Sequence, residues 1–344
     1  MSSKERELNE ALPPRVTTAL FGHGEAEAAM LAAYRSGRVP HAFLLIGQKG
    51  IGKATLAYRM ARFALAHPDP AAPDVRSATS LAVNPEHPVA RRVAGQAHGD
   101  LLTLERTENE KGVLRQQIAV EDVRRTVPFF GATAGEGGWR IAIVDAVDEL
   151  NRFGANALLK VLEEPPQKAM LFLVCHSAAR VLPTLRSRCA VVALRPLAQA
   201  DVAAALAAAM QLPPDDPRIA PAAAVAGGSV ARAAAFLDAD ALELRQRALD
   251  QLERLPALDP NALHALGDAL AGVDPLPLLA FIDTINGWLA QRVEGNPGAL
   301  GRVAPLAEAF SRINQATRDA IEYNLERKPL VFNVFGLLAE ATRG

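Results

Sequence analysis

Short apolar stretches rich in branched side chains recur through the first part of the chain. They cover residues 43–46, 101–104, 141–144, 171–174 and 191–194. Apolar and polar residues do not alternate within these stretches, which is typical of strands buried on both faces. Helical patterns or long loops separate them. The pattern therefore predicts an α/β fold with a five-stranded parallel sheet covered by helices.

One amphipathic helix supports this architecture. Residues 149–164 carry apolar side chains at spacings of three and four, which predicts a single buried face. That face would consist of Leu150, Phe153, Ala157, Leu158, Val161 and Leu162. Pro165 and Pro166 end the helix, because proline cannot continue the hydrogen-bond ladder.

The remaining chain divides by composition. Residues 67–98 contain five prolines and no period, which predicts an insertion or loop between the first helix and the second strand. After Leu197 the strand patterns stop and Ala-rich helical sequence continues to the end. We therefore expect an α/β domain over 1–197, a small helical domain over 198–240 and a larger helical domain over 241–344.

The composition limits the classes of ligand and the cellular location expected for this protein. The 344 residues carry a formal charge of −1, so no global positive field marks nucleic acid as a dominant direct ligand. No membrane-length apolar run and no signal-like N-terminus is present, so we expect a soluble, cytoplasmic protein without a membrane partner. Cys175 and Cys189 lie among apolar residues and are expected to be buried, reduced thiols.

The Pro-rich segment contains three histidines, at positions 67, 87 and 98. Their spacing is irregular and they lack cysteine partners, so no zinc or other metal site is expected there.

Residues 43–65 form a strand, a glycine-rich loop and a helix in sequence. Gly47, Gly50 and Gly52 let backbone amides, with that of Ile51 between them, surround phosphate oxygens. The helix N-terminus adds its dipole, and Lys53 can reach the β- and γ-phosphates. The loop predicts a site for ATP or ADP; a tight strand-to-helix turn without a ligand is the alternative.

Two parts of an ATPase site are missing. Ala54 follows the lysine where a Ser or Thr hydroxyl would bind Mg²⁺, and Thr55 is turned by about 100° around the helix. The strand 141–144 ends in Asp145, which could organise Mg²⁺, but Ala146 stands where a catalytic Glu is expected. The chain should therefore bind Mg²⁺ weakly and hydrolyse ATP slowly or not at all.

Asp148 and Glu149 come shortly after this strand. We expect them to lie at the start of the next helix and to complement its dipole. A displaced catalytic base is the other interpretation.

Two later segments are more specific. Residues 156–166 contain Asn-Ala-Leu-Leu-Lys-Val-Leu-Glu-Glu-Pro-Pro, and residues 182–189 contain Leu-Pro-Thr-Leu-Arg-Ser-Arg-Cys. Together they resemble the clamp-loader branch of AAA+ ATPases. The resemblance implies that Arg188 reaches ATP bound by a neighbouring subunit and stabilises charge on its γ-phosphate, a role suited to a permanently charged guanidinium. A surface arginine before a strand is the simpler reading.

A degraded phosphate loop beside an intact Ser-Arg-Cys triplet resembles the delta-prime family of the bacterial DNA polymerase III clamp loader. Segments 20–24, 36–42 and 324–333 also resemble that family. The resemblance implies a RecA-like AAA+ domain, a helical lid and a helical collar that joins the subunits. It also implies that Arg232, in the predicted lid, contacts nucleotide; a solvated helix arginine is equally open. Many relatives carry a four-cysteine zinc module between the first helix and second strand, which this sequence lacks.

The resemblance implies partners as well. They are the delta subunit and three tau/gamma motor subunits in a heteropentamer, which opens the β sliding clamp and loads it onto primer-template DNA. The chain would then be a subunit of a DNA-directed DNA polymerase without ATPase activity of its own.

Two alternatives remain. A self-sufficient AAA+ motor, of the tau/gamma or branch-migration helicase type, is opposed by Ala54 and Ala146. A small-molecule nucleotide kinase could use the same phosphate loop, but it would not explain the Ser-Arg-Cys triplet.

Overall fold

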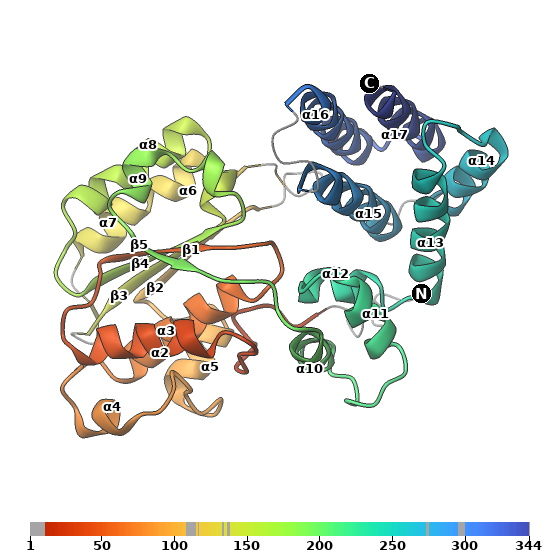
Figure 1. The fold of residues 1–344 in the computed structure, drawn as a ribbon. Coiled ribbons are helices and arrows are strands. Elements are labelled where there is room, and N and C mark those ends of the chain that lie inside the picture. Colours follow the sequence, from red (N-terminus) through yellow and green to blue (C-terminus); the bar gives the residue numbers. More distant parts are fainter. Residues whose placement is uncertain are drawn as a thin grey trace. The chain divides into compact units, whose positions relative to one another are not determined.

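The computed structural model describes residues 11–107, 115, 117–132, 134–135, 138–272, 275–294 and 300–343. Contacts divide the chain into two compact units (Figure 1). The first, here the α/β unit, comprises Met1–Asp216 and Gly227–Ala231, and the second, the helical unit, comprises Pro217–Ala226 and Arg232–Gly344. The finer division at residues 197 and 240 stays a prediction.

The α/β unit is built on one sheet whose strands are all parallel. Its strands are β1 (Ala42–Ile46), β2 (Leu101–Glu105), β3 (Arg140–Asp145), β4 (Ala169–Cys175) and β5 (Ala190–Ala193). Their order in the sheet is β2-β3-β4-β1-β5. Every residue of β4 is buried, as a strand covered on both faces requires. The predicted α/β fold with a five-stranded parallel sheet is confirmed.

Helices cover both faces of the sheet (Figure 1). One face carries α2 (Gly24–Arg35), α3 (Lys53–Ala66), α4 (Pro73–Ser77) and α5 (Pro88–Ala94); the other carries α6 (Val120–Arg124), α7 (Thr126–Gly131), α8 (Arg152–Glu163) and α9 (Pro183–Arg186). Alternate residues of a strand pack into two separate cores on opposite faces of the sheet. Phe43 and Leu45 pack with the first group of helices, and Leu44 packs with the second. Short 3₁₀ turns at Val147–Glu149 and Ala178–Arg180, and α10 (Gln199–Met210), complete the unit.

The helix predicted over 149–164 begins later, at Arg152. Asn151 caps it by accepting a hydrogen bond from the Gly154 amide at 2.8 Å. Phe153 was predicted to face the core, and this is wrong, because the residue is 72% exposed. It precedes the buried Leu158 by five residues, which turns it about 140° away from that side of the helix.

The Pro-rich segment is more ordered than the predicted insertion or loop. It forms α4 and α5 and buries Val75, Leu81 and Val93 in the core under the sheet. Glu27 of α2 anchors its middle by accepting a hydrogen bond from the Leu81 amide at 2.9 Å. Local periodicity could not reveal this, because tertiary contacts rather than a repeating pattern fix the segment.

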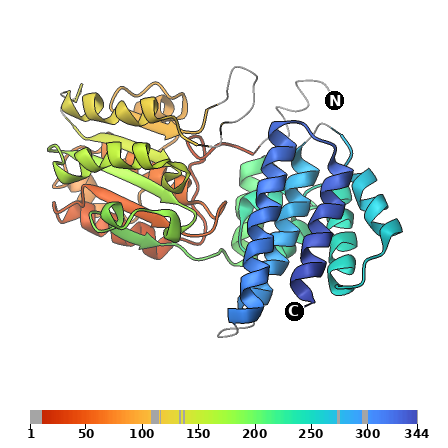
Figure 2. The same ribbon diagram turned by 90° about the horizontal axis from the view of Figure 1, so that it is seen from above.

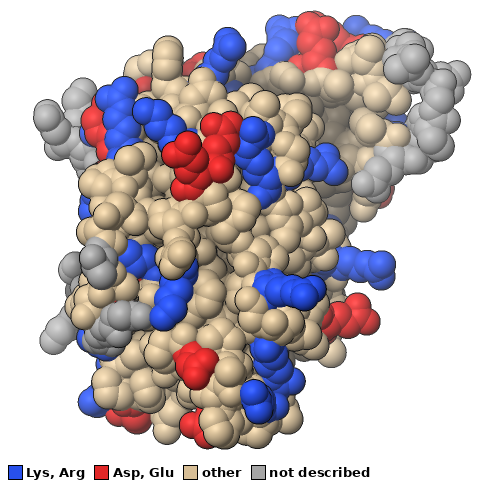
Figure 3. Space-filling view, turned by 90° about the vertical axis from the view of Figure 1, so that its left-hand side faces the viewer, with Lys and Arg blue, Asp and Glu red and all other residues tan. Residues whose placement is uncertain are grey.

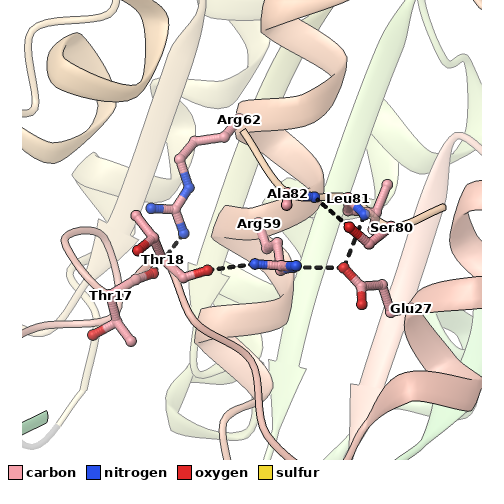
Figure 4. A network of polar contacts seen from close by, with 8 residues as sticks. All are labelled: Thr17, Thr18, Glu27, Arg59, Arg62, Ser80, Leu81 and Ala82. Atoms are coloured by element: carbon pink, nitrogen blue, oxygen red, sulfur yellow. Dashed lines mark hydrogen bonds and ion pairs between the residues drawn. The ribbon is translucent and has the colours of Figure 1, made fainter. Parts of the chain in front are cut away.

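A largely buried charge network surrounds that anchor (Figure 4). Arg59 of α3 pairs with Glu27 at 2.5 Å and also donates to the Thr18 carbonyl. Arg62, one turn later, donates to the Thr17 carbonyl at 2.6 Å. The helix after the phosphate loop thus ties the N-terminal segment, α2 and the Pro-rich segment together.

The helical unit contains seven described helices (Figures 1 and 2). They are α11 (Ile219–Val225), α12 (Val230–Ala235, whose first two residues belong to the α/β unit), α13 (Ala239–Glu253), α14 (Pro260–Ala269), α15 (Pro275–Glu294), α16 (Leu300–Glu322) and α17 (Arg327–Thr342). The last five share one core around Leu252, Phe281, Ile313 and Phe335. Among the described helices, none combines the length and apolar character needed to cross a bilayer.

Candidate functional site

The phosphate loop connects β1 to α3, as the sequence predicted. Gly50 and Gly52 have φ values of 78° and 101°, a region that favours glycine. Gly50 is also crowded, since a Cβ there would lie 2.5 Å from Ser229 Oγ and from the Ala231 Cβ. Ile51 between them is fully buried. The loop therefore needs glycine for its backbone shape and, at Gly50, for space.

Lys53 lies inside this loop with its side chain turned back onto it. Only 3% of the residue is exposed. Its Nζ donates to the carbonyls of Gly47 at 2.7 Å and Gln48 at 2.5 Å. Burial lowers the pKa of Lys53 to about 8, although attraction to Asp145 partly opposes the shift. The ammonium thus has protein acceptors, which it must exchange for phosphate oxygens if nucleotide binds.

Distant residues bind the carbonyls of the same loop. Ser229 Oγ donates to Lys49 O and the Val230 amide donates to Gly50 O, both at 2.9 Å. His23 Nε2 lies 2.7 Å from Ile51 O, and burial lowers the pKa of this histidine, which favours the neutral ring with its proton on Nε2. Sequence reasoning missed His23 and Ser229, because only the fold brings them to the loop.

The two residues expected to replace Mg²⁺-binding and catalytic groups lie together. Ala54 and Ala146, with Val174 of β4, form one small apolar cluster, and each is less than a tenth exposed. Thr55 follows Ala54 in the first turn of α3 and is half-buried. The side of the site where metal and water chemistry would occur is lined with methyl groups.

Asp145 ends β3 next to this cluster. Burial, and then repulsion by Glu149, raise the pKa of Asp145 to about 6, and the charge of Lys53 opposes the shift. This carboxylate is the remaining candidate at the site for organising Mg²⁺. Its charged form is disfavoured relative to an ordinary aspartate.

Asp148 and Glu149 do not lie at a helix start, so that prediction is wrong. They lie in the 3₁₀ turn Val147–Glu149, since the Asn151 cap delays α8. Asp148 accepts hydrogen bonds from the amides of His176 at 2.8 Å and Ser177 at 3.1 Å, which fixes the end of β4. Glu149 pairs with Arg106 at 2.7 Å.

His176 is a further residue that sequence reasoning missed. It directly follows β4, and burial, with repulsion from Lys53 as the next cause, lowers its pKa to about 4. The ring is therefore neutral near pH 7. The signal available in the sequence was its position after a buried apolar strand, where parallel-sheet proteins gather polar groups.

Arg188 lies just before β5, with 36% of its side chain exposed. Its guanidinium pairs with Glu163 at 2.8 Å and donates to the Thr184 carbonyl at 2.9 Å. β1 and β5 are parallel neighbours, with Phe43 beside Ala190 and Ile46 beside Ala193. Arg188 therefore lies at the amino end of these strands, whereas the phosphate loop follows their carboxyl end.

On one face of the α/β unit, the described basic side chains do not form one continuous patch. Figure 3 shows a face of the α/β unit on which Lys and Arg are scattered among uncharged surface and a few acidic groups. On that face, the charge distribution agrees with the nearly neutral total charge of −1.

Arg232 lies in α12, within the helical unit. It forms an ion pair with Asp283 of α15, and its side chain is 25% exposed. A nucleotide contact by this arginine stays a prediction, as do the ligand roles of the phosphate loop.

Both cysteines are thiols in the structure. Cys175 is fully buried and Cys189 is half-buried. Burial raises the pKa of each thiol to about 11, so neither is a reactive thiolate near pH 7.

Comparisons with known proteins show the family to which this chain belongs. A family model described as "DNA polymerase III, delta subunit" matches residues 22–198. DNA polymerase III subunit delta' of Pseudomonas aeruginosa is 34% identical over 265 residues, which cover 76% of this chain and 75% of that protein. The chain belongs to the delta-prime family of DNA polymerase III clamp-loader subunits.

Other members of this family match over shorter stretches. Subunit delta' of Escherichia coli is 30% identical over 167 residues, 46% of this chain and 44% of that protein. Among solved structures, a DNA polymerase III gamma subunit-related protein of Thermotoga maritima aligns over 91% of this chain and all of its own, with 15% identity and a TM-score of 0.40. The sequence matches, rather than this structural likeness, establish the family.

Proposed function

We propose that this chain acts as a delta-prime subunit that lends Arg188 to ATP held by a neighbouring motor subunit and hydrolyses no ATP itself. The observation that carries the proposal is the position of Arg188. It is partly exposed at the amino end of β5, opposite its own phosphate loop.

Strand geometry explains why a partner's nucleotide is the better target. Four residues of β1 and β5 are paired between the two ends, which corresponds to roughly 10 Å or more of strand. A guanidinium must come within about 3 Å of a phosphate oxygen to donate a charge-assisted hydrogen bond. Arg188 is therefore poorly situated for its own loop but accessible to a ligand carried by another subunit.

The chain's own phosphate-loop pocket supports the proposal that it hydrolyses no ATP itself. ATP or ADP could still bind through the loop amides and Lys53, after the amine leaves the carbonyls of Gly47 and Gln48. Mg²⁺-assisted hydrolysis is disfavoured because Ala54 and Ala146 offer no oxygen ligand or base. We infer a polymerase subunit that retains the ATPase fold without the turnover, and that requires no zinc.

The proposed partners follow from the family. Relatives of this chain include proteins named as delta', gamma and gamma/tau subunits of DNA polymerase III. We propose a cytoplasmic heteropentamer with delta and three tau/gamma subunits, which loads the β sliding clamp onto primer-template DNA. This chain would contact the clamp and DNA through that complex.

The deciding experiment replaces Arg188 in the reconstituted loader. Arg188→Ala should leave assembly intact and lower the rate of clamp loading at least tenfold, because arginines supplied in trans accelerate phosphoryl transfer by about 10³ to 10⁵ in GTPases. DNA-stimulated ATPase should fall less, since Arg188 serves only one of the three proposed motor sites. Arg186→Ala, an exposed arginine on α9, is the matched control. Unchanged loading and turnover with Arg188→Ala would count against the proposed function.

A further inference from the structure

The Arg188 guanidinium has two partners on neighbouring elements. Glu163, the last residue of α8, binds one terminal nitrogen at 2.8 Å. The Thr184 carbonyl on α9 accepts from the other terminal nitrogen at 2.9 Å. Because a guanidinium carries five N–H donors, these two contacts leave donors for a further acceptor.

The backbone that carries Arg188 is also fixed. Ser187 Oγ donates to Thr184 O at 3.2 Å, and Cys189 Sγ donates to Leu185 O at 3.2 Å. Leu185 is 1% exposed and anchors α9 in the core next to α8. Both flanking members of the triplet therefore hold the turn, and the main freedom left is in the side chain of Arg188.

We propose that Glu163 is a positioning residue for Arg188, a role that rests on the proposed function. Its carboxylate restricts the guanidinium to the orientation seen here, so that less freedom is lost when a triphosphate on the neighbouring subunit binds the remaining donors. Glu163 itself touches no substrate; it acts through the arginine. A charge-assisted ion pair is directional enough to hold the guanidinium in one orientation. The side chains of Arg188 and Glu163 are 36% and 50% exposed, so the arginine stays accessible to a ligand.

The test uses the assembled loader with Glu163→Gln, which keeps the side chain's size and removes its charge. Glu164→Gln is the matched control, because Glu164 is the adjacent exposed carboxylate. We expect clamp loading at saturating ATP to slow by about two- to fivefold, the range that an exposed ion pair allows. The ATP concentration for half-maximal rate should change less than the rate itself, since Arg188 is proposed to act on charge that develops on the γ-phosphate during transfer. Glu163→Asp should restore part of the rate.

A double variant separates positioning from a general structural effect. Glu163→Gln combined with Arg188→Ala should load no more slowly than Arg188→Ala alone, because both changes remove the same contribution. Additive losses would overturn the proposal.

The remaining outcomes are also decisive. If Arg188→Ala slows loading but Glu163→Gln does not, or if Glu163→Gln accelerates it, the positioning role is wrong and the proposed function stands. Acceleration would mean that Glu163 sequesters the arginine. If Arg188→Ala itself has no effect, both proposals fall.

Discussion

Ala54 and Ala146 share one buried apolar cluster, although they follow different elements of the sheet. Ala54 belongs to the first turn of α3 and Ala146 directly follows β3; Val174 of β4 completes the contact. Two losses that lie far apart in the sequence are thus one feature of the pocket. A metal-binding hydroxyl and a catalytic carboxylate are both replaced at the point where they would have to cooperate.

Restoring both groups should not restore ATP hydrolysis. We expect the isolated chain, and its Ala54→Thr/Ala146→Glu variant, to turn over ATP well below about 1 per second, the low end for competent enzymes. The cluster is buried and apolar, and Lys53 is engaged by its own loop. Phosphate release measured on the purified chains tests this.

The same variant should be less stable. Ala146 is fully buried, so Ala146→Glu must bury a carboxylate beside Asp145, at a cost of about 2–4 kcal/mol in unfolding free energy. Ala54→Thr alone serves as the comparison in urea denaturation. In the turnover measurement, a double variant that hydrolyses ATP about as fast as an active ATPase would refute the interpretation that this pocket does not support hydrolysis.

Asp145 should make stability depend on pH in a defined direction. The folded-state pKa of about 6 lies above the unfolded value of 3.8, so the folded chain keeps this proton longer as pH rises. The stabilisation of the folded state by this retained proton is fully present below about pH 4, and it is lost as pH rises through 6. Between these values, the unfolding free energy should fall by about 1–2 kcal/mol more in the wild type than in Asp145→Asn. Equal pH profiles from urea denaturation would contradict the assigned pKa.

The Glu27–Arg59 pair should matter more than an exposed pair. Its side chains are only 12–13% exposed, and the neighbouring Arg62 is buried enough to lower its pKa to about 10. Glu27→Gln leaves buried cations without a carboxylate and should cost about 2–4 kcal/mol. Glu86→Gln, which breaks the exposed Glu86–Arg91 pair, should cost under about 0.5 kcal/mol. If chemical denaturation gave similar losses of unfolding free energy for the two variants, burial would not explain the strength of the Glu27–Arg59 pair.

The sequence by itself determined the five strands and the phosphate loop. The five strands were predictable because a parallel sheet covered on both faces needs continuous apolar runs, as β4 illustrates. The loop ending in Lys53 was predictable because its glycines, lysine and flanking elements are adjacent in the chain. The substitutions at Ala54 and Ala146 were visible for the same reason.

Only the tertiary structure decided which remote residues meet. It brought His23 and Ser229 onto the phosphate loop, joined Ala54 to Ala146, and set Glu163 against Arg188. It also exposed Phe153, because the Asn151 cap and the contacts of α8, rather than the spacing of apolar residues alone, chose the buried face. Local patterns encode how each segment folds, whereas contacts between distant segments depend on how the finished elements pack.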